Sequence, residues 1–264
     1  MRPVEPVELP APVAAAMAEW LRVHDDVAPG TIEGLYLVGS VAFGDWKLHS
    51  DVDVIAVVAD PSDPDLFGDL AAAQFALTSE IPVDGTYLGW GDLVVPPMAA
   101  HRPWVLDGEY HVDGESFEIN PVTWYTLAAY GIALRGERPD RIGVFLDEVE
   151  RRLFVRENLQ TYWRGVGERL AAAIESDAAI DSADGAVLEW VALGVARMLY
   201  TWDTGDVTSK SRAGRWAAER APDFAEMLHS AVDLRAAPGL ATRSQLLDAV
   251  AFAEAVIDNV STDG

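Results

Sequence analysis

The sequence is centred on a segment that reads Leu35-Tyr-Leu-Val-Gly-Ser-Val-Ala-Phe-Gly-Asp-Trp-Lys-Leu-His-Ser-Asp-Val-Asp-Val-Ile-Ala-Val-Val58. It begins and ends with apolar runs of the kind that buried β-strands show. Between these runs lie Gly39-Ser40, which breaks the first run, and Ser50-Asp-Val-Asp53, which leads directly into the second. The segment therefore predicts two buried strands whose connection carries a Gly-Ser turn and a pair of carboxylates.

The spacing of the two carboxylates predicts a common task. Residues i and i+2 of a β-strand point to the same face, so we expect Asp51 and Asp53 to aim their side chains at one point. Two such oxygen ligands suit Mg²⁺, whose remaining ligands would be water and substrate phosphates. Gly39 allows a phosphate to approach the backbone, and the Ser40 hydroxyl and nearby amides can donate hydrogen bonds to it. These features predict a metal-dependent site for nucleotidyl transfer.

Short motifs of this type also occur without any function. In that alternative, Asp51 and Asp53 are turn and strand-edge residues, and Gly39-Ser40 is a simple turn. The complete pattern is far more specific than Asp-x-Asp alone, because it combines a strand, Gly-Ser, Ser-Asp-x-Asp and a second strand in this order. We therefore favour the functional interpretation.

A third carboxylate, Asp84, lies at the start of the alternating segment Val83–Trp90, which is predicted to be a strand beside the first two. Asp84 can act as general base on a substrate hydroxyl, or it can complete the metal site. Alternatively, it belongs to a Pro-Val-Asp-Gly turn without further function. The motif at residues 39–53 favours the first interpretation.

Composition limits the classes of function. The chain has 264 residues, of which 50% are hydrophobic, enough for one large or two modest domains. Its net charge of −24 argues against nucleic acid as a partner, and fits either attraction of a cationic small molecule or solubility alone. The absence of cysteine excludes disulfides and thiolate metal sites. No signal peptide or membrane span is evident, so we expect a soluble cytoplasmic protein without membrane contact. A monomer is the expected oligomeric state.

The other elements of the first half are predicted from apolar periodicity and turn residues. Helices are expected over residues 11–27, 66–79 and 121–134. The last of these has Asn120 as its cap. Residues 91–120 are expected to form a long loop or a short hairpin, in which Trp104 and Tyr110 pack more readily than they stack on a ligand. His101, in the same segment, is expected at the surface.

The character of the sequence changes at about residue 144, where strand signals give way to long apolar-periodic helices. Helices are expected over residues 145–175, 185–203, 209–220, 222–234 and 242–260. We therefore expect two domains, residues 1–143 and residues 144–264. The predicted fold class is α+β, with a mixed sheet and flanking helices followed by an all-α bundle.

Two basic residues of the predicted bundle have an unusual setting. Arg197 lies on a helix that ends near Gly205, a suitable C-cap, and Thr208 or Ser209 can cap the next helix. Lys210 falls in the first turn of that next helix, where a lysine opposes the helix dipole, so a nearby anion would explain it. Arg197 and Lys210 either hold a triphosphate together, or they are a buried arginine paired with an acid and a solvated lysine.

The segment of residues 35–58 resembles the nucleotidyltransferase signature of the DNA polymerase beta-like superfamily. Three other blocks resemble the streptomycin/spectinomycin adenylyltransferases. They are the segment from Arg197 to Lys210, the following Arg215-Trp-Ala-Ala-Glu-Arg220 and Ala133-Leu-Arg-Gly136. The resemblance covers most of the chain, from about residue 35 to residue 220, and is clear in these blocks. The pairing of the N-terminal motif with the C-terminal segment is its most specific part.

This resemblance implies a two-domain enzyme that transfers AMP from ATP to an aminoglycoside hydroxyl with Mg²⁺, in a cleft between its domains. By the same resemblance, Asp51 and Asp53 bind the metal, and Asp84 is the catalytic base, one methylene shorter than the glutamate that is usual in the family. The residues that match the nucleotide loop are Gly39, Ser40 and Ser50, and those that match the phosphate-contacting residues of the second domain are Arg197 and Lys210.

Two alternatives stay open at the level of sequence. The chain can be a nucleotidyltransferase-like regulatory or antitoxin module that binds a nucleotide without turnover. It can also be an adenylyltransferase that acts on a different small molecule or on a protein side chain. The intact third carboxylate, Asp84, favours catalysis, because a degenerate copy has no need to retain it.

Overall fold

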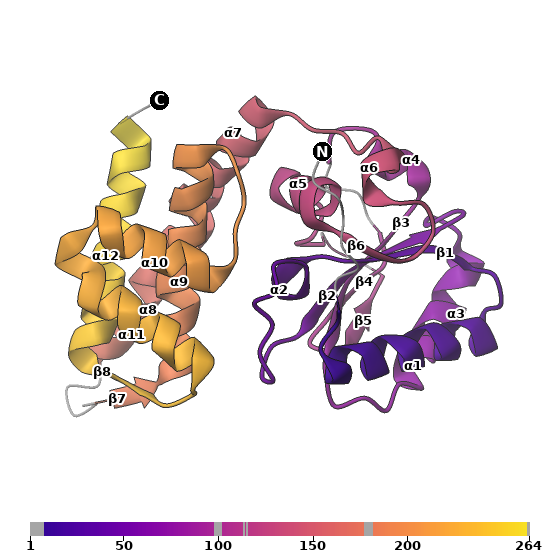
Figure 1. Ribbon diagram of the computed structural model, residues 1–264, viewed down its shortest axis with the longest axis horizontal. Helices are drawn as coiled ribbons and strands as arrows, with labels where there is room; N and C mark the ends of the chain where they lie inside the picture. The colour runs from indigo at the N-terminus through magenta and orange to yellow at the C-terminus, as the bar shows by residue number, and fades with distance from the viewer. Residues whose placement is uncertain (1–7, 98–101, 113, 115, 177–181, 263–264) are drawn as a thin grey trace. The chain divides into compact units, whose positions relative to one another are not determined.

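The computed structural model describes residues 8–97, 102–112, 114, 116–176 and 182–262. The chain divides into two compact units, a sheet domain of Met1–Asp147 and a helical domain of Glu148–Gly264 (Figure 1). The fold class is α+β, as the sequence predicts. The boundary expected after residue 143 falls between the last helix of the sheet domain and the first helix of the helical domain.

A six-stranded mixed sheet in the order β5-β4-β3-β2-β1-β6 forms the centre of the sheet domain. The strands are β1 (Ile32–Leu37), β2 (Val52–Val58), β3 (Val83–Leu88), β4 (Trp104–Leu106), β5 (Glu109–His111) and β6 (Ile132–Arg135). Strands β2 and β3 are parallel, and all other neighbours in the sheet are antiparallel. The end of β1 and the starts of β2 and β3 therefore meet at one edge of the sheet.

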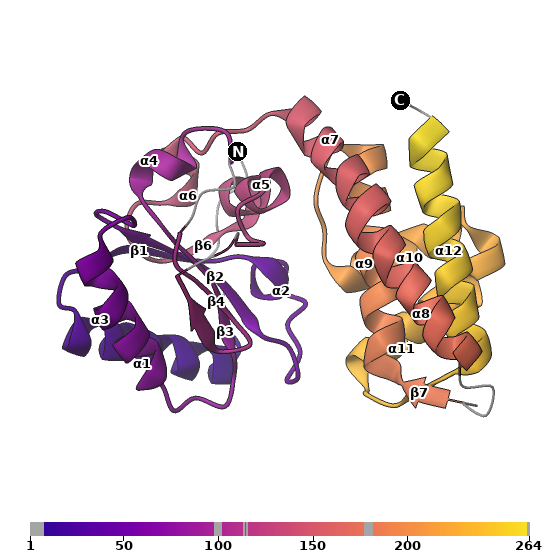
Figure 2. The ribbon, with the colours of Figure 1, turned by 180° about the vertical axis from the view of Figure 1, so that it is seen from behind.

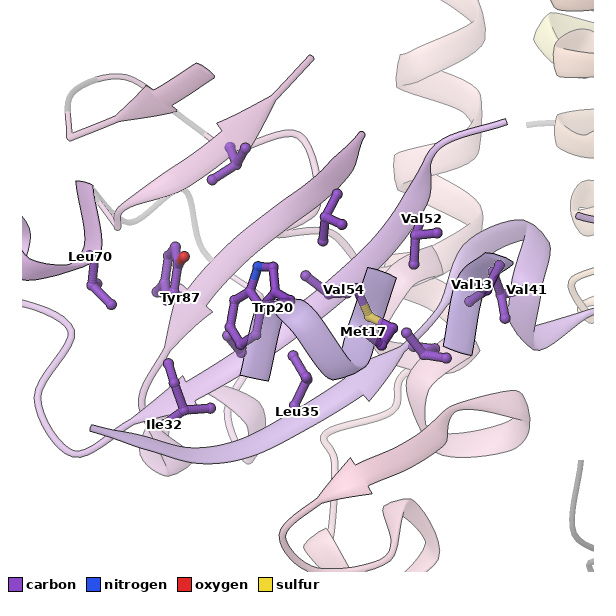
Figure 3. Packing of buried hydrophobic residues seen from close by; sticks show 14 of the residues in the cluster. Val13, Met17, Trp20, Ile32, Leu35, Val41, Val52, Val54, Leu70 and Tyr87 are labelled. Atoms are coloured by element: carbon purple, nitrogen blue, oxygen red, sulfur yellow. The ribbon is translucent and has the colours of Figure 1, made fainter. Parts of the chain in front are cut away.

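Helices cover both faces of this sheet. They are α1 (Ala11–Val27), α2 (Gly39–Ala42), α3 (Pro64–Phe75), α4 (Trp90–Leu93), α5 (Pro121–Tyr130) and α6 (Pro139–Ile142). On one face, Trp20 of α1 and Leu70 of α3 are buried with Val54 of β2 (Figure 3). On the other face, Trp124 of α5 is buried with Ile55 of β2. Burial of these large apolar side chains is the main stabilising contribution to the domain.

The predicted helix over residues 121–134 is too long. Helix α5 begins at Pro121, where the Asn120 side chain accepts hydrogen bonds from two backbone amides, and it ends at Tyr130. Residues 132–135 instead form strand β6, which pairs with β1. So short an apolar run has no distinctive periodicity. Pairing as a strand satisfies backbone groups of β1 that a longer helix would leave without partners.

Other helix boundaries also differ from the prediction. The helix expected over residues 66–79 is α3, which starts earlier because the Asp63 carboxylate caps it by accepting a hydrogen bond from the Asp65 amide, and which ends at Phe75. The helix expected to begin at residue 145 begins at Glu148. The hairpin that was one of the two expectations for residues 91–120 is present as the antiparallel pair β4–β5.

The helical domain consists of long helices joined by short turns (Figure 2). Its elements are α7 (Glu148–Asn158), a π-helical segment (Leu159–Trp163), α8 (Arg164–Ser176), β7 (Ser182–Asp184), α9 (Gly185–Thr204), α10 (Lys210–Arg220), a 3₁₀ turn (Pro222–Phe224), α11 (Ala225–Ala236), β8 (Leu240–Thr242) and α12 (Arg243–Thr262). The expectation of helices alone is wrong at one point, because β7 and β8 form a small antiparallel pair. Strands this short carry no periodic signal.

Close helix packing in this domain depends on two glycines. A Cβ atom on Gly214 of α10 would lie 2.6 Å from Leu193 Cδ2 of α9 and 2.7 Å from Val232 Cγ2 of α11. A Cβ on Gly194 of α9 would overlap the ring of Trp163, the last residue of the π-helical segment. These contacts fix how α9, α10 and α11 approach one another. Within the part of the chain that the structure describes, no helix has the length and hydrophobicity needed to cross a bilayer.

Candidate functional site

The first predicted carboxylate site is built where β1 ends and β2 begins. Gly39 follows β1 with a φ of +53°, and its backbone lies directly against the Asp53 side chain, so that a Cβ on Gly39 would overlap Asp53 Oδ2. The Val38 amide also donates a hydrogen bond to the Asp53 carbonyl, at 2.9 Å. Only glycine satisfies both the left-handed backbone and the close approach. The Gly-Ser motif thus packs its backbone onto a carboxylate of the Asp-x-Asp motif.

The three predicted carboxylates come together through the parallel pairing of β2 and β3. Asp53 is the register partner of Asp84, so the two side chains leave the same face of the sheet. Asp51 precedes β2 and is exposed, Asp53 is partly buried, and Asp84 is only 2% exposed. The charge of Asp51 helps to raise the pKa of Asp84, so the two carboxylates lie within range of electrostatic interaction. The predicted grouping of Asp51, Asp53 and Asp84 at one edge of the sheet is present.

The β4–β5 turn holds the carboxylate of Asp84. The Gly108 amide donates a hydrogen bond to Asp84 Oδ1 at 3.3 Å, and Asp107 and Gly108 have left-handed φ angles of 53° and 77°. Burial raises the pKa of Asp84, and the charges of Asp51 and Asp107 add to this effect, whereas the amides of Asp107 and Gly108 oppose it. A raised pKa suits a carboxylate that must accept a proton near neutral pH.

Helix α3 supports this turn from behind. The buried Gln74 side chain donates a hydrogen bond from Nε2 to the Gly108 carbonyl at 3.3 Å. A continuous path of hydrogen bonds therefore runs from Gln74 through Gly108 to Asp84. Sequence reasoning missed this path. The Asp107-Gly108 pair is a known hairpin signal and identifies the turn, but nothing in the sequence connects that turn to Asp84.

The loop between β1 and β2 carries the predicted nucleotide-binding residues. The Ser40 hydroxyl is buried and has no hydrogen-bond partner among the described residues, so it is available to donate to a ligand. Ser50 closes a turn in which its hydroxyl accepts from the Lys47 amide at 3.4 Å. Lys47 adds a positive charge to this loop, and its Nζ lies 3.3 Å from Asp45 Oδ1. The sequence analysis did not identify this residue.

The donor set fits a divalent cation that is bound only in part by protein. No group of three or more His, Cys, Asp or Glu residues in the described ranges is arranged to enclose a metal ion. Asp51 and Asp53 offer two carboxylates on one side, and the unpartnered Ser40 hydroxyl lies in the same loop system. Mg²⁺ usually binds through one or two carboxylates together with waters and substrate phosphates, which agrees with this set.

The helical domain carries Arg197 and Lys210 on the two consecutive helices α9 and α10. Helix α9 ends at Thr204, and its C-cap Gly205 donates its amide to the Thr201 carbonyl at 2.9 Å. Ser209 caps α10 by accepting from the Arg212 amide at 3.2 Å. Lys210 is the first residue of α10. The positive charge of Arg197 contributes to lowering the pKa of Lys210, so the two cations lie within range of electrostatic interaction.

The anion expected near Lys210 is present, and it is a side chain of the same domain. Glu189 Oε1 accepts hydrogen bonds from Lys210 Nζ at 3.3 Å and from Arg235 Nη1 at 2.6 Å. Sequence reasoning missed both Glu189 and Arg235. Their positions on α9 and α11 converge only through helix packing, and no local pattern in the sequence identifies them.

The aromatic residues of the loop region pack within the sheet domain. Trp104 stacks on His111 with ring centroids 4.2 Å apart, and Tyr110 meets Tyr87 edge-on at 6.1 Å. This agrees with the expectation that these aromatic side chains pack against the protein rather than stack on a ligand. His101, which was expected at the surface, lies outside the described residues.

Comparisons with known proteins place this geometry in context. Residues 160–259 match the model of the aminoglycoside adenylyltransferase C-terminal domain. The structure is similar to that of the spectinomycin adenyltransferase AAD(9) from Enterococcus faecialis, determined with ATP and spectinomycin. The TM-score is 0.66 at 15% identity, over 93% of this chain and 99% of the other, a similarity of fold. No protein with curated annotation matches the sequence.

Proposed function

We propose that the chain is an aminoglycoside adenylyltransferase that transfers AMP from ATP to a hydroxyl of an aminoglycoside or aminocyclitol of the streptomycin/spectinomycin type. The match of residues 160–259 to the C-terminal domain of that family supports this proposal. The observation that carries the proposal is the grouping of Asp51, Asp53 and buried Asp84 beside the Gly39-Ser40 turn. The proposal is also supported by the similar fold of an enzyme whose structure was determined with ATP and spectinomycin.

Asp51 and Asp53 would hold Mg²⁺ in this proposal. When bound, the ion would offset negative charge on the phosphates and on the leaving pyrophosphate. The two residues then have different tasks. Asp53 is kept in place by the Gly39 backbone, whereas Asp51 is exposed at the start of β2 and remains accessible to an incoming nucleotide.

Asp84 would act as general base. The acceptor oxygen forms a bond to the α-phosphorus of ATP, the bond from that phosphorus to the bridging oxygen breaks, and pyrophosphate leaves. Asp84 takes the proton of the acceptor hydroxyl. Its raised pKa, caused first by burial, increases its proton affinity, and the hydrogen bond from the Gly108 amide orients the carboxylate.

The nucleotide would be held by residues of both domains. Ser40 would donate to a phosphate through its unpartnered hydroxyl, and Ser50 would shape the same loop. Arg197 and Lys210 of the helical domain would contact the triphosphate, as cations commonly do. We therefore propose that the two domains act on one ATP molecule, and that the reaction needs neither a second copy of the chain nor a nucleic acid. The need for ATP suggests the cytoplasm as its location.

The test is an assay of pyrophosphate release with ATP and Mg²⁺, run separately with spectinomycin, streptomycin and kanamycin. We expect release that depends on spectinomycin or streptomycin. Binding of ATP without release under any condition would favour a regulatory module instead. Modification of a protein rather than of a drug would favour a protein acceptor.

The variant Asp53→Asn tests the metal assignment in the same assay. We expect it to abolish AMP transfer, because the amide removes one anionic ligand. The melting temperature should stay nearly unchanged, because asparagine has almost the same size and Asp53 is only partly buried. Retained turnover would contradict the assignment.

A further inference from the structure

Three helices of the helical domain contribute one ionic cluster, here called the Glu189 cluster: Glu189 of α9, Lys210 of α10 and Arg235 of α11. A single oxygen, Glu189 Oε1, accepts from Lys210 Nζ at 3.3 Å and from Arg235 Nη1 at 2.6 Å. The side chains of Glu189 and Arg235 are 8% and 3% exposed, whereas that of Lys210 is 27% exposed. The Glu189–Arg235 pair is therefore the buried base of the cluster, and Lys210 lies at its edge.

Stability alone does not account for this arrangement. A buried ion pair gains little over an apolar replacement of the same size, because the cost of removing the charges from water offsets their attraction. Lys210 is also the first residue of α10, where the helix dipole disfavours a positive charge. Such an arrangement makes sense when the lysine must be kept charged and pointed at a second anion.

We propose that Glu189 is a positioning residue for Lys210: anchored by Arg235, it holds the Lys210 ammonium in place and in its charged form for the phosphates of ATP. The identity of the anion rests on the proposed function. The positioning of Lys210 rests on the contacts of the Glu189 cluster alone, so the two can be tested separately.

The charges that face Lys210 determine in which direction its pKa should move when Glu189 is removed. From α9 they are Glu189 and Arg197, and from α11 Arg235. Burial lowers the pKa of Lys210, and the charges of Arg235 and Arg197 lower it further, while Glu189 alone raises it. Burial would raise the pKa of Glu189 itself, but Lys210 and Arg235 outweigh this effect and keep it low. Without Glu189, every remaining influence favours the neutral amine.

The composition of the chain allows a direct measurement. Lys47 and Lys210 are its two lysines, against seventeen arginines. Protein labelled with ¹³C-lysine therefore gives two side-chain signals, and the variant Lys47→Arg assigns them. We expect Glu189→Gln to lower the titration midpoint of Lys210 by about 1 to 3 pH units, the usual effect of losing an adjacent opposite charge. ATP binding, measured by calorimetry from pH 7 to pH 10, should lose affinity at a correspondingly lower pH.

Matched variants keep the test decisive. Glu254→Gln changes an exposed acid of α12 and should leave the midpoint of Lys210 unchanged. Because Glu189→Gln leaves Arg235 buried with an uncharged partner, circular dichroism checks that the variant folds. The double variant Glu189→Gln/Arg235→Gln removes one charge of each sign. Its midpoint should lie above that of the single variant and below that of the wild type, since Glu189 influences Lys210 more than Arg235 does.

A midpoint of Lys210 that is unchanged in Glu189→Gln, or that in the double variant equals or exceeds the wild-type value, would overturn the positioning role. If the midpoint moves as expected but the wild-type protein fails to bind ATP, positioning stands and the proposed function fails. If ATP binds and its alkaline limit does not follow the midpoint of Lys210, the part of the inference that assigns ATP as the anion is wrong.

Discussion

Gly39 shows how one missing side chain determines the position of a carboxylate. Its backbone occupies the space beside Asp53 that a Cβ would need. We predict that Gly39→Ala displaces Asp53 and lowers the rate of pyrophosphate release by at least about tenfold, as a shift of about 1 Å at a reacting group can do.

Gly44→Ala is the matched control for this change. Gly44 has a similar φ of +65°, but a Cβ added to it would meet no atom within 4 Å. Both variants should lose about 1 kcal/mol of stability from left-handed strain, measured by urea unfolding. Only Gly39→Ala should lose most of its activity. Equal activities in the two variants would mean that Asp53 does not need its present position.

His24 makes the stability of the sheet domain depend on pH. It is fully buried, stacks on Trp20, and its Nδ1 donates to the Trp20 carbonyl at 2.8 Å. Nε2 therefore accepts from the Tyr87 hydroxyl at 3.0 Å, which requires a neutral ring. Burial lowers the pKa of His24 from 6.5 to about 4.

The sign of the effect follows from linkage. Below pH 6.5 the His24 ring binds a proton in the unfolded chain, whereas in the folded chain it stays neutral down to about pH 4. We predict that the free energy of unfolding falls by about 2 kcal/mol between pH 7 and pH 5, measured by urea titration. His24→Gln should remove this decrease even if it is less stable, while replacement of exposed His229 by glutamine should keep it. If the free energy of unfolding of His24→Gln still falls with pH as in the wild type, other groups cause the decrease.

At the scale of the element, the β4–β5 turn acts as a holder for Asp84. Two of its amides favour the charged carboxylate, and Gln74 anchors the turn through Gly108. We predict that Gln74→Leu loosens the turn and raises the pKa of Asp84 further. The acidic limb of the pH–rate profile should then move to higher pH by about half a unit or more. A shift of this size corresponds to part of the free energy of one hydrogen bond.

Phe75→Leu, at the neighbouring and 93% exposed position, is the control for this prediction. Its pH–rate profile should coincide with that of the wild type. A profile of Gln74→Leu that falls in rate without shifting would show that Gln74 contributes only to stability.

The same elements show which features a sequence of this kind reveals. Strands β1 and β2 were predicted from local apolar runs and β3 from a local alternation of residues. Gly39, Asp53 and Asp84 were found because they lie within or directly beside these segments. Strand β6 was missed because its partner, β1, lies about a hundred residues earlier in the chain. Glu189 and Arg235 were missed for a similar reason, since three helices must pack before the two residues meet.

At the scale of the whole molecule, the negative charge is unevenly distributed. Residues 1–147 carry 24 acidic and 7 basic residues, while residues 148–264 carry 19 acidic and 12 basic ones. The sheet domain, which holds the candidate carboxylates, is thus the stronger attractor for a cationic acceptor. We predict that raising the salt concentration from about 0.05 M to 0.5 M increases the KM for the drug several-fold, because screening weakens this attraction.

The turnover number at saturating drug should stay nearly constant over the same range. The KM for ATP, an anion, is the internal control, and it should not rise in parallel with that of the drug. Parallel increases would point to a general effect of salt on the fold. A constant KM for the drug would mean that the acidic residues serve solubility alone.

The π-helical turn between α7 and α8 makes chain length a constraint on the helical domain. A π-helical turn behaves as one residue inserted into an α-helix. Deleting a single residue from Leu159–Trp163 would restore a regular helix, but it would rotate everything on one side of the turn by about 100° relative to the other. Trp163 would then leave the notch that Gly194 provides. An insertion or deletion here would be more disruptive than most substitutions, although each turn of the helix would remain well formed.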